Sequence, residues 1–359
     1  MRSDSSGLRE SIEAALPMPQ GAPAVPIGLV GCGWIAGLQL QAYRHAGFNV
    51  VALADRHPDR AEEYRRRYAP HASVHGSLDG LLQHPGLGVV DIATHTSGRA
   101  AMVRQCINAG VAVLSQKPFV DDLEVGLELA REARAAGVTL AVNQNGRWAP
   151  HFAAMRAIVA AGIIGDIVSA DFQVSWPHDL VVANMPVFRE MDDLVLFDFG
   201  AHWFDMVATL APAAGTLVVQ AEVDRRPGQA IAAPMQADAL VTGPAFRAAL
   251  SFRAGERFAE TGAYRVSGTA GVLTHVGRSL GGTEVRVHTG AGTAAVEISP
   301  DWFTHGLAGA MREVLDSVAT GEVPDNSADS ALKGLALCFA AVESARTGAR
   351  VMVGEAKTR

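Results

Sequence analysis

The sequence predicts a two-domain α/β protein, with a doubly wound parallel sheet first and an α+β domain with a mostly antiparallel sheet second. Its 359 residues exceed what one hydrophobic core usually organises. Apolar runs of strand length alternate with helical stretches as far as about residue 143. Beyond that point strand-like runs follow one another through short turns, which favours antiparallel pairing.

The first half repeats a strand–helix pattern. Gly47, Gly110 and Gly137 each close a helical stretch, as glycine commonly does at a helix C-terminus. Such β–α alternation implies right-handed crossovers between parallel strands buried on both faces. The predicted strands cover residues 26–30, 50–54, 89–93, 112–114 and 139–142, and the predicted helices cover 35–45, 58–68, 99–108 and 123–136.

The second half begins with a predicted helix over residues 151–161. Two final helices, 303–320 and 328–347, should cover the second sheet or pack back on the first domain. We predict a mobile leader over residues 1–24, with a short helical possibility near 8–16, then domains over 25–146 and 147–359. The predicted strands are 167–174, 217–223, 237–241, 246–252, 263–267 and 284–288.

Charge and composition exclude several classes of protein. The net charge is −7 and no basic stripe is present, so nucleic acid is not an expected partner. No apolar stretch reaches the ~18 residues that span a bilayer, and the first segment is acidic, so we expect no membrane partner and a cytoplasmic location. The three cysteines are far apart in sequence, which argues against disulfides and a zinc cluster.

A glycine motif follows the first predicted strand and opens the first helix. Gly31-Cys32-Gly33-Trp34-Ile35-Ala36 matches G-x-G-x-x-G/A. Gly31 permits a tight turn, Gly33 lets a pyrophosphate approach the backbone, and Ala36 keeps the helix close to the sheet. Trp34 and Ile35 open the helix whose N-terminus would face the phosphates, so the motif predicts a dinucleotide site.

An acidic residue stands where such a site needs one. Asp55 ends the second strand, at the spacing from which a carboxylate hydrogen-bonds the ribose hydroxyls of the cofactor. The alternative is a solvated aspartate that starts a turn or caps the following helix. A carboxylate repels a 2′-phosphate whereas Arg56 could accommodate one, so NAD is favoured and NADP is not excluded. Arg56 could equally stack on adenine or point into water.

Lys117 is one of three lysines in the chain and follows the apolar run 111–114. It therefore projects from the carboxyl end of a strand, where open α/β sheets bind ligands. Its ammonium could hydrogen-bond a substrate oxygen and help pass a proton, or merely contact phosphate or solvent.

A second polar group lies in Asp198-Phe199-Gly200-Ala201-His202-Trp203-Phe204-Asp205. On one regular helix Asp198 and His202 would be i,i+4 neighbours, with Asp205 continuing the face. The alternative is an N-capping Asp198 and a core histidine. Asp and His can ligate metal, but with no cysteine nearby we expect none.

Together these motifs resemble the glucose-fructose oxidoreductase, inositol dehydrogenase and rhizopine catabolism family, Gfo/Idh/MocA, from about residue 25 to 353. The glycine motif, Val90-Asp91-Ile92-Ala93-Thr94, Gln116-Lys117-Pro118 and Asp198-x-Gly200-x-His202-x-x-Asp205 carry the resemblance. It implies a Rossmann domain followed by an open-faced sheet that often makes homodimer or homotetramer contacts.

The resemblance also implies roles. His202 would be the general base on a substrate hydroxyl while hydride leaves for the nicotinamide, Asp198 would orient the hydroxyls, and Lys117 would position substrate and cofactor. Gln116 replaces the family's Glu, although its amide can still bind the cofactor. After Thr94, where Pro is usual, this chain has His95-Thr96-Ser97-Gly98-Arg99, so the loop with Thr94, His95 and Ser97 is a cofactor-binding loop of altered shape.

Five further residues are candidates for the substrate pocket. Asn145, Arg147 and Trp148 follow the last strand of the first domain, and Trp176 and His178 follow the first strand of the second. Hinge hydrogen bonding is the alternative for Asn145 and Arg147, and core filling is the alternative for Trp148 and Trp176.

These observations favour an NAD(P)-dependent dehydrogenase or reductase of a small sugar, polyol or keto-sugar. An NAD-recycling glycosidase without net redox change is a second hypothesis. A non-catalytic sensor of NAD or sugar is a third, against which the retention of Lys117, Asp198 and His202 argues.

Overall fold

The computed structural model describes residues 5–16, 21–189, 191–211, 215–278, 280–356 and 358. Residues 1–4 and 17–20 of the predicted leader lie outside this description. The chain forms two compact units. The Rossmann unit comprises residues 21–148 and 303–333, and the sheet unit comprises the described residues of 5–16, 149–302 and 334–358.

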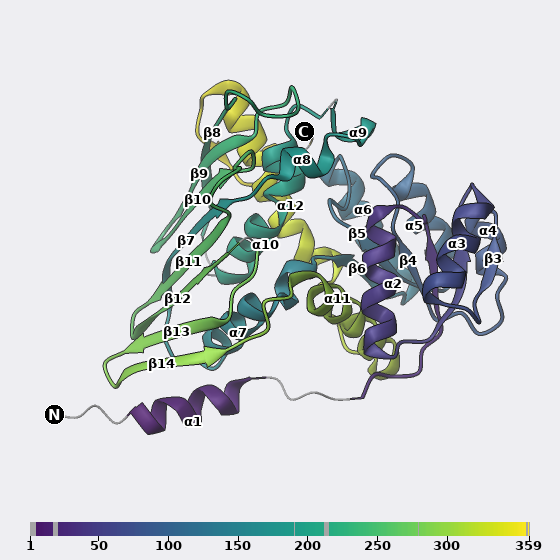
Figure 1. The fold of residues 1–359 in the computed structure, drawn as a ribbon, viewed down its shortest axis with the longest axis horizontal. Coiled ribbons are helices and arrows are strands. Elements are labelled where there is room, and N and C mark those ends of the chain that lie inside the picture. Colours follow the sequence, from purple (N-terminus) through teal and green to yellow (C-terminus); the bar gives the residue numbers. More distant parts are fainter. Residues whose placement is uncertain are drawn as a thin grey trace. The chain divides into compact units, whose positions relative to one another are not determined.

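The Rossmann unit contains a six-stranded sheet in the order β3-β2-β1-β4-β5-β6, with every neighbouring pair parallel. This confirms the predicted doubly wound sheet (Figure 1). The strands are β1 (Ile27–Val30), β2 (Val50–Ala54), β3 (Ser73–His75), β4 (Val89–Ile92), β5 (Ala112–Gln116) and β6 (Leu140–Asn143), and the helices are α2 (Trp34–Ala46), α3 (Pro58–Tyr68), α4 (Leu78–Leu82), α5 (Arg99–Asn108), α6 (Leu123–Ala136) and η1 (Asn145–Trp148).

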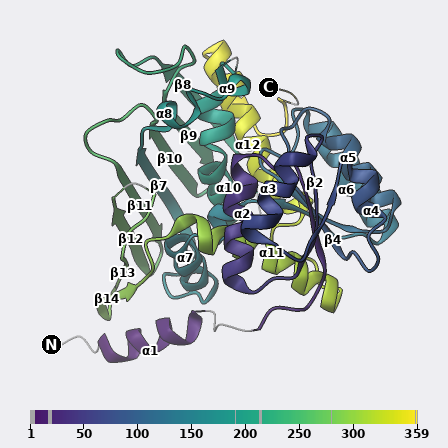
Figure 2. The ribbon, with the colours of Figure 1, turned by 45° about the vertical axis from the view of Figure 1, so that its right-hand side comes forward.

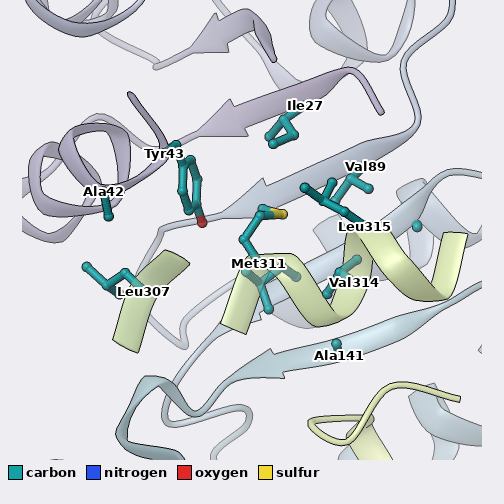
Figure 3. Packing of buried hydrophobic residues seen from close by; sticks show 11 residues of the cluster. Ile27, Ala42, Tyr43, Val89, Ala141, Leu307, Met311, Val314 and Leu315 are labelled. Carbon is teal, nitrogen blue, oxygen red and sulfur yellow. The ribbon is translucent and has the colours of Figure 1, made fainter. Parts of the chain in front are cut away.

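A helix from the end of the chain completes this core. Met311 and Leu315 of α11 (Trp302–Thr320) pack with Ile27 of β1, Val89 of β4 and Tyr43 of α2, all fully buried (Figure 3). Burying a large apolar side chain stabilises a fold by roughly 1.5–3 kcal/mol. Apart from β3, the strands of this sheet are mostly apolar, because both faces of the sheet are covered.

Three short elements of this unit were absent from the sequence prediction, namely β3, α4 and η1. The three residues of β3, Ser73–His75, do not form an apolar run like those that indicated the other strands, and they are only partly buried. The single turn of α4 is capped by Ser77, whose hydroxyl accepts the Gly80 N–H at 3.2 Å. Elements this short carry too few residues for periodicity to indicate them.

The sheet unit contains nine strands in the order β14-β13-β12-β11-β7-β10-β9-β8-β15. The β7–β10 pair is parallel and the other pairs are antiparallel, which confirms a mostly antiparallel sheet. Its strands are β7 (Ile167–Ser175), β8 (Val218–Asp224), β9 (Gln236–Gly243), β10 (Phe246–Arg253), β11 (Thr261–Gly268), β12 (Gly271–Gly277), β13 (Glu284–Thr289), β14 (Gly292–Glu297) and β15 (Val351–Met352); the sequence prediction missed β12, β14 and β15.

Helices line one face of this sheet. These are α7 (Pro150–Ala160), α10 (Ala201–Leu210) and the later turns of α12 (Ala328–Thr347), and no helix of the described chain covers the opposite face (Figures 1 and 2). The short helices α8 (His178–Val182) and α9 (Pro186–Arg189) follow β7. No helix among the described residues is both long enough and apolar enough to cross a bilayer.

The segment predicted to be a mobile leader contains a helix, α1 (Ser5–Ala15), near the helical pattern noted in the sequence. Leu8 and Ile12 are its buried residues. The helix contacts β14 and α7 of the sheet unit. The mobility of the leader stays a prediction.

Candidate functional site

The glycine motif forms the turn between β1 and α2. Gly31 has φ 97°, and a Cβ there would lie 2.8 Å from Thr94 Cγ2, so both the backbone conformation and the space require glycine. A Cβ on Gly33 would meet nothing within 4 Å. The N-terminus of α2 is therefore open on the side from which a pyrophosphate would approach.

Asp55 is tied to this turn. One carboxylate oxygen accepts the Cys32 N–H at 2.8 Å and the other accepts the His57 N–H at 2.8 Å. Each carboxylate oxygen keeps lone pairs for a further donor, such as a ribose hydroxyl. Asp55 is buried whereas Arg56 is exposed.

The two residues that open α2 differ in their surroundings. Trp34 is 52% exposed, with its ring edge-on to Phe303 at 6.2 Å between centroids. Ile35 packs its side chain on the cores beside the sheet. Trp34 can therefore offer its ring to a ligand, whereas Ile35 offers its backbone.

The turn that carries Lys117 is held from two sides. The Lys117 N–H donates to Gln116 Oε1 at 2.7 Å, and the Lys117–Pro118 peptide bond is cis. On the other side the buried Arg99 guanidinium donates to the carbonyl oxygens of Gln116 at 2.7 Å, Phe119 at 3.2 Å and Pro118. From the sequence, Arg99 was named only as the end of the run 95–99, which departs from the family pattern after Thr94.

The loop after β4 adjoins the same guanidinium, because Arg99 also donates to the Thr94 carbonyl. Thr94 is half-buried, and His95 and Ser97 are exposed. The structure thus links the Thr94–Gly98 loop and the Lys117 turn through one side chain.

Buried amides gather at the carboxyl ends of β5 and β6. Gln116 and Asn143 are register partners in the parallel pair. Gln116 Nε2, both polar atoms of the Asn143 side chain and Asn145 Oδ1 are buried without a hydrogen-bond partner in the described chain. Unpartnered buried polar atoms are rare and at a strand end they fit a ligand site.

Arg147 is used inside the Rossmann unit. Its fully buried guanidinium donates to the Asp325 carbonyl and, at 2.9 Å, to Ser330 Oγ. These contacts join η1 to Asp325 and to Ser330 in the first turn of α12, so they support the hydrogen-bonding alternative for Arg147.

The Asp198 segment does not form the regular α-helix that the sequence predicted. Residues Val195–Phe199 form a π-helical turn, and α10 starts only after Gly200, which takes the N-cap position assigned to Asp198 in the alternative interpretation. A Cβ on Gly200 would lie 2.8 Å from the Leu196 carbonyl oxygen and 3.0 Å from the Phe252 ring. A π-helical turn thus stands where the sequence argument assumed regular α-helical spacing. Such turns occur frequently at functional sites.

This π-helical turn brings three predicted residues together. His178 Nε2 lies 3.6 Å from the Asp198 carboxylate, and both side chains are nearly buried. The His178 ring stacks on Trp176 at 5.5 Å and contacts Phe199 at 4.8 Å between centroids. Trp176, His178 and Asp198 thus form one imidazole–carboxylate cluster with an aromatic wall.

His202 lies on the first turn of α10, with its ring 5.6 Å from that of Trp302. Asp205 is almost fully buried, and a Cβ on Gly334 would lie 3.1 Å from its Cβ, which places it where α10 and α12 approach closely. Asp205 thus belongs to the packing of α10 on α12.

A buried ion pair involves Asp179, the residue that follows His178 in the chain. The fully buried Asp179 carboxylate accepts two hydrogen bonds from Arg257, at 2.7 and 2.5 Å, and one from the Ala230 N–H at 2.7 Å. Burial raises the pKa of Asp179, but the hydrogen bonds from Arg257 and the Ala230 N–H outweigh it and lower that pKa overall. Residues 78 positions apart make this pair, so no local sequence pattern could have indicated it.

Comparisons with known proteins agree with this architecture. Residues 25–144 match the model of an oxidoreductase family with an NAD-binding Rossmann fold, and residues 152–274 match the GFO/IDH/MocA C-terminal domain. A D-apiose dehydrogenase of Rhizobium rhizogenes is 28% identical over 54% of this chain, which covers 55% of that relative. Another, of Paraburkholderia graminis, is 27% identical over 90% of this chain and 88% of the relative.

Among solved structures, an oxidoreductase from Agrobacterium radiobacter in complex with NAD+, L-tartaric acid and magnesium superposes with a TM-score of 0.82. It shares 22% identity, and the match covers 92% of this chain and 99% of that one. This likeness shows the shared fold. With both of its domains matched, the chain belongs to the GFO/IDH/MocA family of oxidoreductases.

Proposed function

We propose that this protein transfers hydride between a secondary hydroxyl of a sugar, polyol or keto-sugar and a nicotinamide cofactor. The observation that carries the proposal is the Asp198 carboxylate 3.6 Å from His178 at the start of the His202 helix, in a chain with an NAD-binding domain. A carboxylate beside an imidazole, with a second imidazole one turn on, suits recognition and deprotonation of a hydroxyl.

The Rossmann unit fits the cofactor. Gly33 leaves room for the pyrophosphate, Gly31 forms the tight turn before it, and Asp55 is fixed to accept from the ribose hydroxyls. The buried unpartnered Gln116 Nε2 supplies a donor near the nicotinamide end of such a site. NAD, when bound, would accept hydride from the substrate carbon, and the Asp55 carboxylate favours it over NADP.

Each polar side chain then has a role on the substrate. His202 takes the hydroxyl proton, Asp198 accepts a hydrogen bond from a substrate hydroxyl, and His178 steadies the Asp198 carboxylate. Lys117 donates to the reacting oxygen and stabilises charge that develops there. In the reverse reaction His202 returns the proton.

The relatives favour a polyhydroxylated substrate. Two of the curated relatives are D-apiose dehydrogenases, and one of the solved structural neighbours is in complex with L-tartaric acid. A pocket wall of Trp176 and Phe199 offers the flat aromatic surface on which C–H faces of such molecules pack.

We further propose a homodimer or homotetramer assembled through the sheet face that carries no helix. A shallow groove of about 620 Å³ lies there. Asp171 and Arg265 face each other across β7 and β11 on this surface, so a second copy meets both charge signs. Sedimentation of the intact protein tests this: a monomer at all concentrations would contradict it.

The test of the activity is NADH formation, followed by its absorbance, against inositols, aldoses, sugar acids and amino sugars, with NAD and NADP in parallel. A substrate-dependent signal with NAD supports the proposal. Release of aglycone from aryl glycosides without net NADH would instead support an NAD-recycling glycosidase. Tight NAD and sugar binding with neither reaction would support a sensor.

A further inference from the structure

Arg99 stands out among the buried charged residues of the Rossmann unit. Its side chain is 2% exposed, and its guanidinium donates hydrogen bonds to several main-chain carbonyl oxygens. A buried cation costs free energy unless several acceptors surround it.

The acceptors come from two loops that both carry predicted cofactor contacts. One guanidinium nitrogen donates to Gln116, Pro118 and Phe119, and the other donates to Thr94. The fork of a guanidinium is planar and rigid, so it fixes the spacing of the groups it bridges. Arg99 itself is anchored as the first residue of α5.

The contact to Gln116 acts directly on the peptide that precedes Lys117. In a trans peptide the C=O and the N–H point to opposite sides. Here the carbonyl of Gln116 accepts from Arg99 at 2.7 Å, and the N–H of Lys117 donates to Gln116 Oε1 at 2.7 Å. The peptide plane that sets the direction of Lys117 is thus held at both edges.

We propose that Arg99 is the positioning residue for Lys117, and that it fixes the Lys117 turn relative to the Thr94–Gly98 loop before any ligand binds. The inference deepens the proposed function and rests on it for its kinetic consequence. Its structural core, the arrangement of the two loops, is independent of the reaction.

Arg99→Lys tests the proposal because lysine keeps the charge but lacks the planar fork. With the substrate found in the panel above, we expect kcat to fall by about 100-fold, as misplacement of a reacting group by 1 Å can do, with the KM of the substrate changed much less. Arg104→Lys, on the same helix but paired with Glu128 and Glu132, should keep the wild-type kcat.

Tyr43→Phe separates positioning from stability. It removes a buried hydroxyl that donates to Asp91 at 2.6 Å, away from both loops. This variant should lower the melting temperature while kcat stays within about twofold of wild type. If Arg99→Lys lowers the melting temperature equally but leaves kcat unchanged, Arg99 is merely structural and the proposal is overturned.

A spectroscopic readout does not depend on the reaction. The chain has three lysines, so reductive ¹³C-methylation gives few dimethyl-lysine NMR signals, and Lys117→Arg assigns one of them. Because Arg99→Lys would add a fourth lysine, this readout uses Arg99→Gln, in which the Lys117 signal should shift or broaden while the signal of the exposed Lys333 stays in place. An unmoved Lys117 signal would overturn the proposal even if no substrate is ever found; a shift without any turnover would leave Arg99 positioning Lys117 and contradict only the proposed function.

Discussion

Each unit of this protein fully buries a carboxylate, and the partners of the two carboxylates differ. In the Rossmann unit Asp91 accepts from the neutral groups Gln39 Nε2, at 2.8 and 3.0 Å, and Tyr43 Oη, at 2.6 Å. In the sheet unit Asp179 is paired with the cation of Arg257. Burial raises the pKa of Asp91 to about 7, although the hydrogen bonds from Tyr43 and Gln39 lower it. The pKa of Asp179 is instead lowered overall.

The difference shows how each unit holds its part of the site. In the Rossmann unit, neutral groups surround two buried charges, Asp91 and Arg99. In the sheet unit, the pair of opposite charges joins α8, which carries His178, to the segments of Ala230 and Arg257. Neutral partners permit a change of protonation near neutral pH, whereas an ion pair resists it.

The largest expected effect comes from removing one chemical group from each unit. Lys117→Ala and His202→Ala should each lower kcat by about 10²- to 10⁴-fold, because proton handling and charge stabilisation are lost. Isothermal titration should show NAD affinity largely unchanged in both variants. Turnover at the wild-type rate in Lys117→Ala would show that Lys117 takes no part in the reaction.

The buried ion pair gives the largest expected effect on stability. Arg257→Met should lower the free energy of unfolding by about 3–5 kcal/mol, because it leaves the Asp179 carboxylate buried without its cation. Arg286→Met is the matched control, since it breaks an exposed pair with Glu284 and should cost less than about 1 kcal/mol. Equal losses in the two variants, measured by urea denaturation, would contradict the distinction between buried and exposed pairs.

Asp91 should make stability depend on pH in the opposite sense to Asp179. Because the folded pKa of Asp91 lies above its unfolded value of 3.8, its contribution is complete below about pH 4 and is lost as pH rises through about 7. That amounts to at most about 4 kcal/mol. Asp91→Asn should therefore gain stability relative to wild type between pH 4 and 8, and a constant difference over this range would show that Asp91 does not titrate there. The Asp179 contribution is instead present above its unfolded pKa of 3.8 and is lost as pH falls through its lowered folded pKa.

The smallest expected effect concerns the cofactor. Asp55→Asn replaces a carboxylate that accepts from Cys32 and should weaken NAD binding about 10-fold, or roughly 1.4 kcal/mol. Asp59→Asn, an exposed residue in the first turn of α3, should leave NAD affinity unchanged. Both variants are titrated with NAD and NADP. If Asp55→Asn binds NAD as tightly as the wild type does, Asp55 does not bind the ribose hydroxyls.

The two units also differ in how much of them the sequence could predict. The predicted bounds of α3, α5 and α6 match the structure residue for residue, because local signals mark them, such as Pro58 at the start of α3 and Gly137 after α6. The six residues of the glycine motif predicted a cofactor site in the same local way. Local patterns therefore sufficed for most of the fold of the Rossmann unit, and the cofactor site stays a proposal.

The substrate side depends on packing instead. The π-helical turn before Gly200 places that glycine close to Phe252 of β10, and the pair between Asp179 and Arg257 joins residues far apart in sequence. No propensity or spacing encodes either feature. The sequence therefore predicted Trp176, His178 and Asp198 as candidates but not their arrangement as one cluster.

The most direct test of the account follows the hydride itself. With a substrate from the panel deuterated at the reacting carbon and stoichiometric NAD, a single turnover is analysed by mass spectrometry of the nicotinamide product. The account predicts deuterium in the NADH formed by the wild-type protein and none above background in the His202→Ala variant within the same time. Product that forms without deuterium in the NADH would contradict hydride transfer as the function of this protein.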